Sequence, residues 1–226
     1  MIVHKIRLLC YVLVLVTFSP AALWSATAQD YLDQIKAKMS AVKKYSAELR
    51  IKVDVPFLKA PESTASITFE APDKTTIDAP GFAMIPKQGA DLSAQRILSK
   101  PYLAVDAGTD VFRGIRMRKV KIVPVDDADD IATAVIWIDT ISVLPMKVVT
   151  TTRTGGTVTA ELVYDVPAAR EKGLPSYVKL MMNIGNFELP KTMTGDFETP
   201  SPQKGAKGAQ NGMATVEIWY TKYKIQ

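Results

Sequence analysis

The sequence predicts a mainly β fold of the α+β class, a long, strongly curved antiparallel sheet with an N-terminal helix packed against it. Three observations support this fold class. Apolar residues recur with helical spacing in one segment, near residue 35. Most of the remaining chain alternates apolar and polar residues with a period of two, which is typical of half-buried strands. No regular alternation of strands with helices occurs, so a parallel sheet is not expected.

The helix is predicted over Tyr31–Tyr45. Its apolar stripe consists of Leu32, Ile35, Met39 and Val42. Asp30 is expected to cap its start, because a short acidic side chain can accept hydrogen bonds from the free amides of a first helical turn. After Tyr45 the period changes from 3.6 to two, which indicates that the helix gives way to a strand.

The first two strands have one apolar and one polar face. In the first, Leu49, Ile51, Val53 and Val55 alternate with charged residues; in the second, Ala65, Ile67, Phe69 and Ala71 alternate with Ser66, Thr68 and Glu70. Further strands are expected at 74–79, 102–105, 111–123 with a break near Gly114, 133–138, 146–153, 158–164, 177–184 and 215–224. Residues 154–157 (TGGT) predict a hairpin. A membrane-spanning barrel also alternates, but its strands need about 9–11 residues.

Residues 1–28 are typical of a cleaved signal peptide. Lys5 and Arg7 precede an apolar stretch over Leu8–Phe18, and Ala26-Thr27-Ala28 is a small-x-small site, so cleavage is expected after Ala28. A retained membrane anchor and a lipid-modified Cys10 are alternatives. Residues 29–226 then form one domain, with a flexible insertion at 189–212 that has few large apolar side chains. The expected location is the periplasm.

Removal of the signal leaves little catalytic or metal-binding chemistry. Cys10 is the only cysteine and His4 the only histidine. A zinc site of Cys or His ligands and a Ser-His-Asp triad are therefore excluded from residues 29–226. The formal net charge of +5 falls by two when Lys5 and Arg7 leave. Basic residues do not cluster with aromatic ones, so no nucleic-acid partner is expected.

Clustered carboxylates do not change this expectation. Asp126, Asp127, Asp129 and Asp130 crowd one turn. They could hold calcium, but their spacing lacks the ligand order of a calcium loop, and a solvated turn is the preferred interpretation. Asp139 could act as an acid, but no second carboxylate is placed to work with it, and a turn-capping role is preferred. We expect no metal, no cofactor and no enzymatic activity.

Four segments together resemble one protein family. The first is the leading helix followed by Leu49–Val55, and the second is residues 67–74 (ITFEAPDK). The third is residues 137–139 (WID) followed by 144–148 (LPMKV), and the fourth is the closing run 216–223 (VEIWYTKY). In this order and spacing they resemble the bacterial outer-membrane lipoprotein-sorting proteins, the LolA-like superfamily. The resemblance covers most of residues 30–225.

The resemblance implies an unclosed β-barrel wrapped around helices, whose apolar interior holds lipoprotein acyl chains or other lipids. The best-known carrier of the family has an arginine before the proline of the second-strand turn, which holds a lid closed. Ala71 stands at that position here. A lid latched in that way is therefore not expected.

The candidate site residues are apolar. Those that could line a lipid cavity, or instead pack as core under the helix, are Leu49, Ile51, Val53, Ile67 and Phe69. A lid or an ordinary loop could be formed by Phe82, Met84 and Ile85. Lys204 and Lys207 could touch acidic lipid headgroups, although a solvated loop is preferred.

The expected function is that of a soluble, monomeric carrier of acyl chains, with membrane-bound donor and acceptor proteins as possible partners. An exposed methylene costs about 0.8 kcal/mol in water, so a long acyl chain needs an apolar container to cross an aqueous compartment. Two alternatives stay open. One is a regulator that senses lipids or lipoproteins and acts through a protein partner, and the other is a hydrolase that uses carboxylates.

Overall fold

The computed structural model describes residues 26–55, 58–59, 61–72, 74–79, 97–98, 100–126, 130–153, 156–183 and 212–226. The two described helices are α2 (Ala28–Ser40) and α4 (Pro167–Glu171). The strands are β1 (Lys44–Val55), β2 (Leu58–Lys59), β3 (Ser63–Glu70), β4 (Lys74–Asp78), β5 (Tyr102–Phe112), β6 (Ile115–Pro124), β7 (Ile131–Asp139), β8 (Leu144–Thr152), β9 (Thr157–Val163), β10 (Tyr177–Asn183) and β11 (Met213–Ile225).

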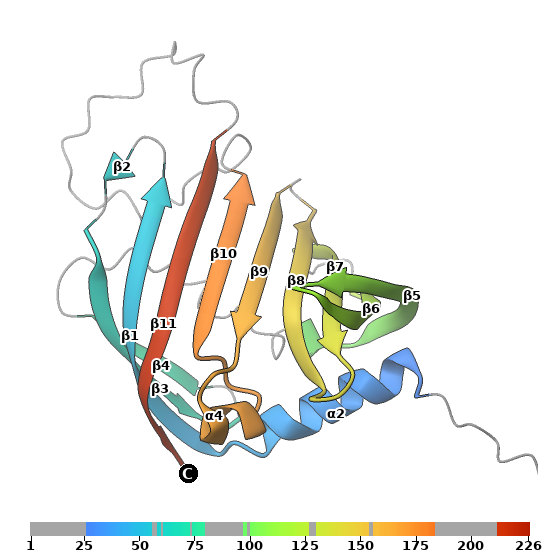
Figure 1. The fold of residues 1–226 in the computed structure, drawn as a ribbon, viewed down its shortest axis with the longest axis horizontal. Coiled ribbons are helices and arrows are strands. Elements are labelled where there is room, and N and C mark those ends of the chain that lie inside the picture. Colours follow the sequence, from blue (N-terminus) through green and yellow to red (C-terminus); the bar gives the residue numbers. More distant parts are fainter. Residues whose placement is uncertain are drawn as a thin grey trace, which may run out of the picture.

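The strands form one antiparallel sheet in the order β4-β3-β1-β11-β10-β9-β8-β7-β6-β5, and β2 pairs with β1 off this path. Within the described residues β4 and β5 each have one neighbour, so the sheet has two free edges and does not close. Figure 1 shows the central strands as a curved fan, with α2 and α4 at the same end of it. The predicted class, an unclosed and strongly curved antiparallel sheet with an N-terminal helix, is confirmed.

The helix begins three residues earlier than the sequence predicted and is shorter. Thr27 is its N-cap, and Asp30 belongs to its first turn. The Thr27 hydroxyl accepts from the Asp30 amide at 3.2 Å, and the Asp30 carboxylate accepts from the Thr27 amide at 2.7 Å. This reciprocal capping box moves the start, because it satisfies two amides that Asp30 alone would leave unpaired. The predicted cleavage after Ala28 stays a prediction, and it would remove the capping hydroxyl.

Strand alternation follows the sequence prediction closely. In β1 the buried residues Ala47, Leu49 and Ile51 alternate with exposed Glu48 and Arg50. The predicted hairpin of β8 and β9 is present, with Lys147 opposite Glu161 and Thr151 opposite Thr157. The short helix α4 was not predicted, because its five residues carry no readable periodicity.

The predicted break near Gly114 is a hairpin turn between β5 and β6. Arg113 and Gly114 both have positive φ, 51° and 76°, which suits the twist of a tight two-residue hairpin. Val111 therefore belongs to β5 rather than to the strand that follows. A second irregularity lies between Asp106 and Thr109, where the register shifts around Gly108 at φ 79°.

The tip of this hairpin lies over the outer face of β7, β8 and β9. Arg113 contacts Glu161 of β9 at 3.0 Å. Asp110 accepts a hydrogen bond from Trp137 Nε1 of β7 at 3.1 Å, and Lys147 of β8 lies 5.5 Å from the centre of the Phe112 ring. These contacts fold the edge of the sheet back onto the sheet, and so shield part of an edge that would otherwise be open to other strands.

A single hydrophobic core joins α2 to the opposite face of the sheet, here called the inner face. Leu32 and Ile35 of α2 are 0% and 2% exposed and share this core with Ile136 of β7 and Ile218 of β11. Among the described residues, no helix is both long and apolar enough to cross a membrane.

Candidate functional site

The predicted cavity residues lie together on the inner face of β1 and β3. Leu49, Ile51 and Ile67 are 4%, 1% and 3% exposed. Register explains the grouping: Leu49 lies opposite Ala65, Ile67 lies opposite Ala47, and Ile51 lies opposite Ile218 of β11. These three side chains belong to the core that includes the apolar stripe of α2.

Val53 and Phe69 occupy different surroundings from the other three. Val53 lies opposite Val216 and is only partly buried. It packs at the margin of the core, so its side chain is within reach of a ligand. Phe69 is 6% exposed and stacks on Tyr45 with ring centres 5.5 Å apart.

Sequence reasoning missed an aromatic cluster beside Phe69. The ring centres of Tyr45 and Tyr223 lie 6.0 Å apart. Those of Tyr223 and Tyr220 lie 6.2 Å apart, and the two rings are nearly parallel. In the last strand, simple alternation from Val216 puts Tyr220 on the inner face and Tyr223 on the outer face. Glu48 and Ser46 of β1 lie opposite Thr221 and Lys224 of β11, so β11 contains one extra residue in this stretch. Lys222 lies in the stretch and has φ 52°. This bulge turns Tyr223 inward.

Hydrogen bonds to backbone carbonyls hold two of the inner tyrosines. The Tyr223 hydroxyl donates to the carbonyl of Pro175 at 2.7 Å. The Tyr164 hydroxyl donates to the carbonyl of Pro145 at 2.9 Å. Burial raises the pKa of Tyr164, Tyr220 and Tyr223, and the neighbouring tyrosines add to the effect at Tyr220 and Tyr223. These phenols are therefore neutral hydrogen-bond donors near neutral pH, and not bases.

We expect these buried phenols to resist ionisation. Their folded-state pKa values lie above the ordinary value near 10, so the neutral form stabilises the fold below about pH 10 and this stabilisation is lost as the pH rises further. Absorbance at 295 nm should show three phenols ionising only as circular dichroism reports unfolding. Tyr164→Phe should remove one of these three late ionisations from the absorbance change. Ionisation of every tyrosine near pH 10 in a folded protein would contradict this.

The two faces of the sheet differ in their chemistry. The inner face of β1, β11, β10 and β9 carries no charged side chain in the described residues, as register and burial show. On the outer face, Arg50 lies 3.9 Å from the centre of the Trp219 ring. Lys147 lies 4.9 Å from the centre of the Trp137 ring. The inner face is therefore suited to apolar ligands, and the outer face to water.

The other predicted positions have simpler roles or lie outside the described residues. Asp139 caps its turn as expected: its carboxylate accepts from the Ile141 amide at 3.0 Å and from the Ser142 hydroxyl at 2.5 Å. Burial opposes ionisation of Asp139, but these hydrogen bonds outweigh it and lower its pKa. No group of three or more His, Cys, Asp or Glu residues in the described part of the chain could hold a metal.

The predicted lid residues Phe82, Met84 and Ile85 lie outside the described residues, as do Lys204, Lys207 and the predicted insertion at 189–212, except for Gly212. Ala71 lies in the exposed turn between β3 and β4. Its amide donates to the carbonyl of Lys43 at 2.8 Å. Its methyl side chain cannot make the hydrogen bonds of a guanidinium, so Ala71 cannot latch a lid in the way described for an arginine at this position.

Comparison with known proteins relates this architecture to solved structures. The sequence matches no protein-family model, and no curated protein matches it. A LolA superfamily protein from Nitrosomonas europaea has a similar structure, with a TM-score of 0.54 at 10% identity over 89% of this chain and 94% of that one. The chain has the LolA-like fold.

Two further solved structures match with similar scores. A domain described as an outer membrane lipoprotein-sorting protein, from Vibrio parahaemolyticus, has a TM-score of 0.51 at 11% identity over 88% of this chain and 94% of that one. A DUF1329 family protein from Desulfovibrio piger has a TM-score of 0.51 at 10% identity over 89% of this chain and 94% of that one. The predicted resemblance is thus confirmed at the level of fold.

Proposed function

We propose that the protein is a soluble periplasmic carrier that binds acyl chains of lipoproteins or other lipids on the inner face and moves them toward the outer membrane. The observation that carries this proposal is the apolar inner face of a sheet with the LolA-like fold, which has no charged side chain on β1, β11, β10 and β9 in the described residues. Each methylene transferred from water to such a surface contributes about 0.8 kcal/mol to binding. Membrane-bound donor and acceptor proteins would complete the route.

Binding rather than catalysis suits the inner face. Its tyrosines are hydrogen-bonded or stacked, and burial keeps their hydroxyls neutral. A general base or nucleophile needs a group that gives up its proton near the working pH. Binding of an acyl chain on the inner face would therefore require no titrating group.

The proposal is tested by placing the same polar side chain on each face of the sheet. Val53→Asn alters a partly buried position of the inner face, and Val135→Asn alters a partly buried position on the outer face of β7. We expect Val53→Asn to weaken binding of a fluorescent fatty acid about tenfold, because a polar amide there loses apolar contact with the chain. Val135→Asn should leave the affinity unchanged.

Urea unfolding of both variants provides the control. Each should stay within roughly 1 kcal/mol of the unmutated protein, because a partly buried amide keeps access to water. Equal loss of binding in both variants would show that the effect is not specific to the inner face. Absence of fatty-acid binding by the unmutated protein would refute the carrier proposal. Ile67 is unsuitable for this test, because its burial in the core would couple binding to folding.

A further inference from the structure

Two arginines of β6 stand where the apolar inner face ends. Val120, which lies on the inner face, is 0% exposed. Two residues before it, and therefore on the same face, Arg118 lies opposite Thr109 of β5 and Ile138 of β7. Arg116 follows on that face and is exposed. A ligand whose chain lies on the inner face would meet these guanidinium groups at its margin.

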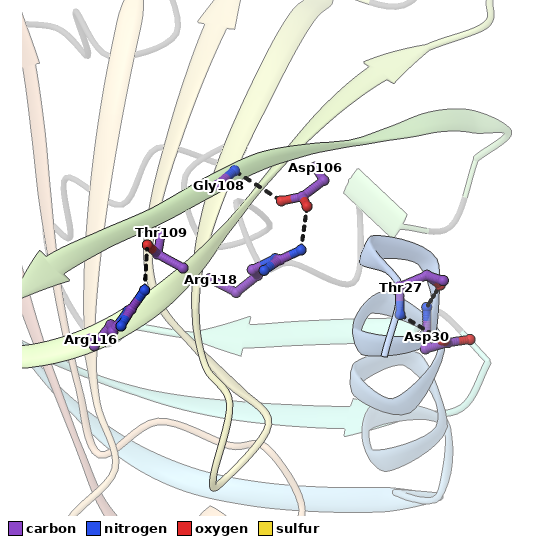
Figure 2. A network of polar contacts seen from close by, with 7 residues as sticks. All are labelled: Thr27, Asp30, Asp106, Gly108, Thr109, Arg116 and Arg118. Atoms are coloured by element: carbon purple, nitrogen blue, oxygen red, sulfur yellow. Dashed lines mark hydrogen bonds and ion pairs between the residues drawn. The ribbon is translucent and has the colours of Figure 1, made fainter. Parts of the chain in front are cut away.

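Within the described residues, the Arg118 guanidinium has only one of its arms paired with an acid. An Nη atom of Arg118 donates to Oδ2 of Asp106, while Oδ1 of Asp106 accepts from the Gly108 amide at 2.9 Å (Figure 2). The Gly108 amide in the bulge thus occupies Oδ1 of Asp106, the second oxygen that a bidentate arginine–carboxylate pair would need. Among the residues that the structure describes, the buried Arg118 Nε has no acceptor.

A buried N–H of a charged group without an acceptor is unfavourable, and an arginine fork is shaped to donate to two oxygens of one phosphate or carboxylate. Arg116 is also weakly paired: an Nη atom of its guanidinium donates a long hydrogen bond of 3.4 Å to the Thr109 hydroxyl. Counted over the described side chains, two arginines against one aspartate leave a net positive charge at this margin.

The acid at the start of α2 does not compensate that charge. Figure 2 shows Thr27 and Asp30 bonded to each other rather than to the arginines. Within the described residues Asp30 forms no ion pair with Arg116 or Arg118. An oxyanion could therefore approach the arginines and find donors that no described acid has taken.

We propose that Arg118, with Arg116 beside it, binds the oxyanion of a lipid headgroup, such as a phosphate, while the acyl chain lies on the inner face. This inference rests on the proposed function and deepens it, because it selects acidic lipids as cargo. Neutral lipids would leave the positive charge of Arg116 and Arg118 uncompensated, so the site discriminates between headgroups rather than between chains.

Two fluorescent probes test the inference on the full-length purified protein. Both carry the same labelled twelve-carbon chain; one ends in a phosphate group and the other in a hydroxyl group. We expect the phosphate probe to bind about tenfold more tightly, because the hydrogen bonds to Arg118 are charge-assisted. Arg118→Gln should bring the ratio of the two affinities close to one. Lys121→Gln, an exposed change on the outer face of the same strand, should leave the ratio unchanged.

Asp106→Asn supplies a second variant, in case Arg118→Gln does not fold. Loss of the carboxylate frees an arm of Arg118, so the preference for the phosphate probe should increase severalfold. A decrease would show that the Asp106–Arg118 pair only supports the hairpin, and would overturn the inference.

The remaining outcomes separate the inference from the proposed function. Equal binding of both probes by the unmutated protein would overturn the inference and leave the carrier proposal standing. Failure of both probes to bind would refute the carrier proposal itself. Inorganic phosphate that binds as tightly as the phosphate probe would show a site for free phosphate, and would likewise overturn the headgroup assignment.

Discussion

Leu32→Ala should destabilise the protein by about 3 kcal/mol, because it removes a large side chain from a fully packed position. Leu32 is 0% exposed and lies in the core between α2 and the sheet. α2 buries only two other residues, Ala28 and Ile35, so the helix has little to replace the lost contact. We expect urea unfolding, followed by circular dichroism, to shift to a lower midpoint with an unchanged slope.

Gln34→Ala is the matched control for this prediction. Gln34 lies on the exposed side of the same helix, and alanine is at least as good a helix former as glutamine. Its unfolding free energy should stay within about 0.5 kcal/mol of the unmutated protein. A loss below about 1 kcal/mol for Leu32→Ala would mean that α2 is not fixed to the inner face by this side chain, and that the packing described here is wrong.

Tyr223→Ala should cost about 3 kcal/mol or more, because it removes a large ring that packs against the core. The bulge at Lys222 places this ring on the inner face. The variant would lose the stack on Tyr220, the contact with Tyr45 and the hydrogen bond to the Pro175 carbonyl. Thermal unfolding and the tyrosine signal of near-ultraviolet circular dichroism measure the loss.

Lys222→Gly separates the bulge from the side chain. Glycine adopts the positive φ of this position without strain, and the exposed contact between Lys222 and Glu48, at 2.9 Å, contributes less than about 1 kcal/mol. This variant should therefore keep near-normal stability. Tyr223→Phe should cost about 1 kcal/mol, the value of one hydrogen bond. If Tyr223→Ala were no more harmful than Tyr223→Phe, the ring of Tyr223 would not be packed on the inner face.

The sequence by itself determined which side chains share a face within each regular element. Leu49 and Ile51 alternate with Glu48 and Arg50, and a strand turns its side chains to opposite faces at each residue. The pattern therefore predicted the inner face of β1 correctly, and that of β11 as far as Tyr220. Leu32 and Ile35 likewise predicted the buried stripe of α2. These features depend on neighbours a few residues apart, so a single sequence displays them.

Only the tertiary structure decided where that alternation is interrupted and what meets across the sheet. The extra residue at Lys222 brings Tyr223 inward, and the bulge at Gly108 turns Asp106 so that it pairs with only one arm of Arg118. The β5–β6 hairpin also reaches Glu161, far along the chain from Arg113. A bulge exists only relative to the strand beside it, and its position follows from the pairing of residues distant in sequence. Local periodicity cannot display that pairing, because its energy comes from contacts that form only when the sheet has folded.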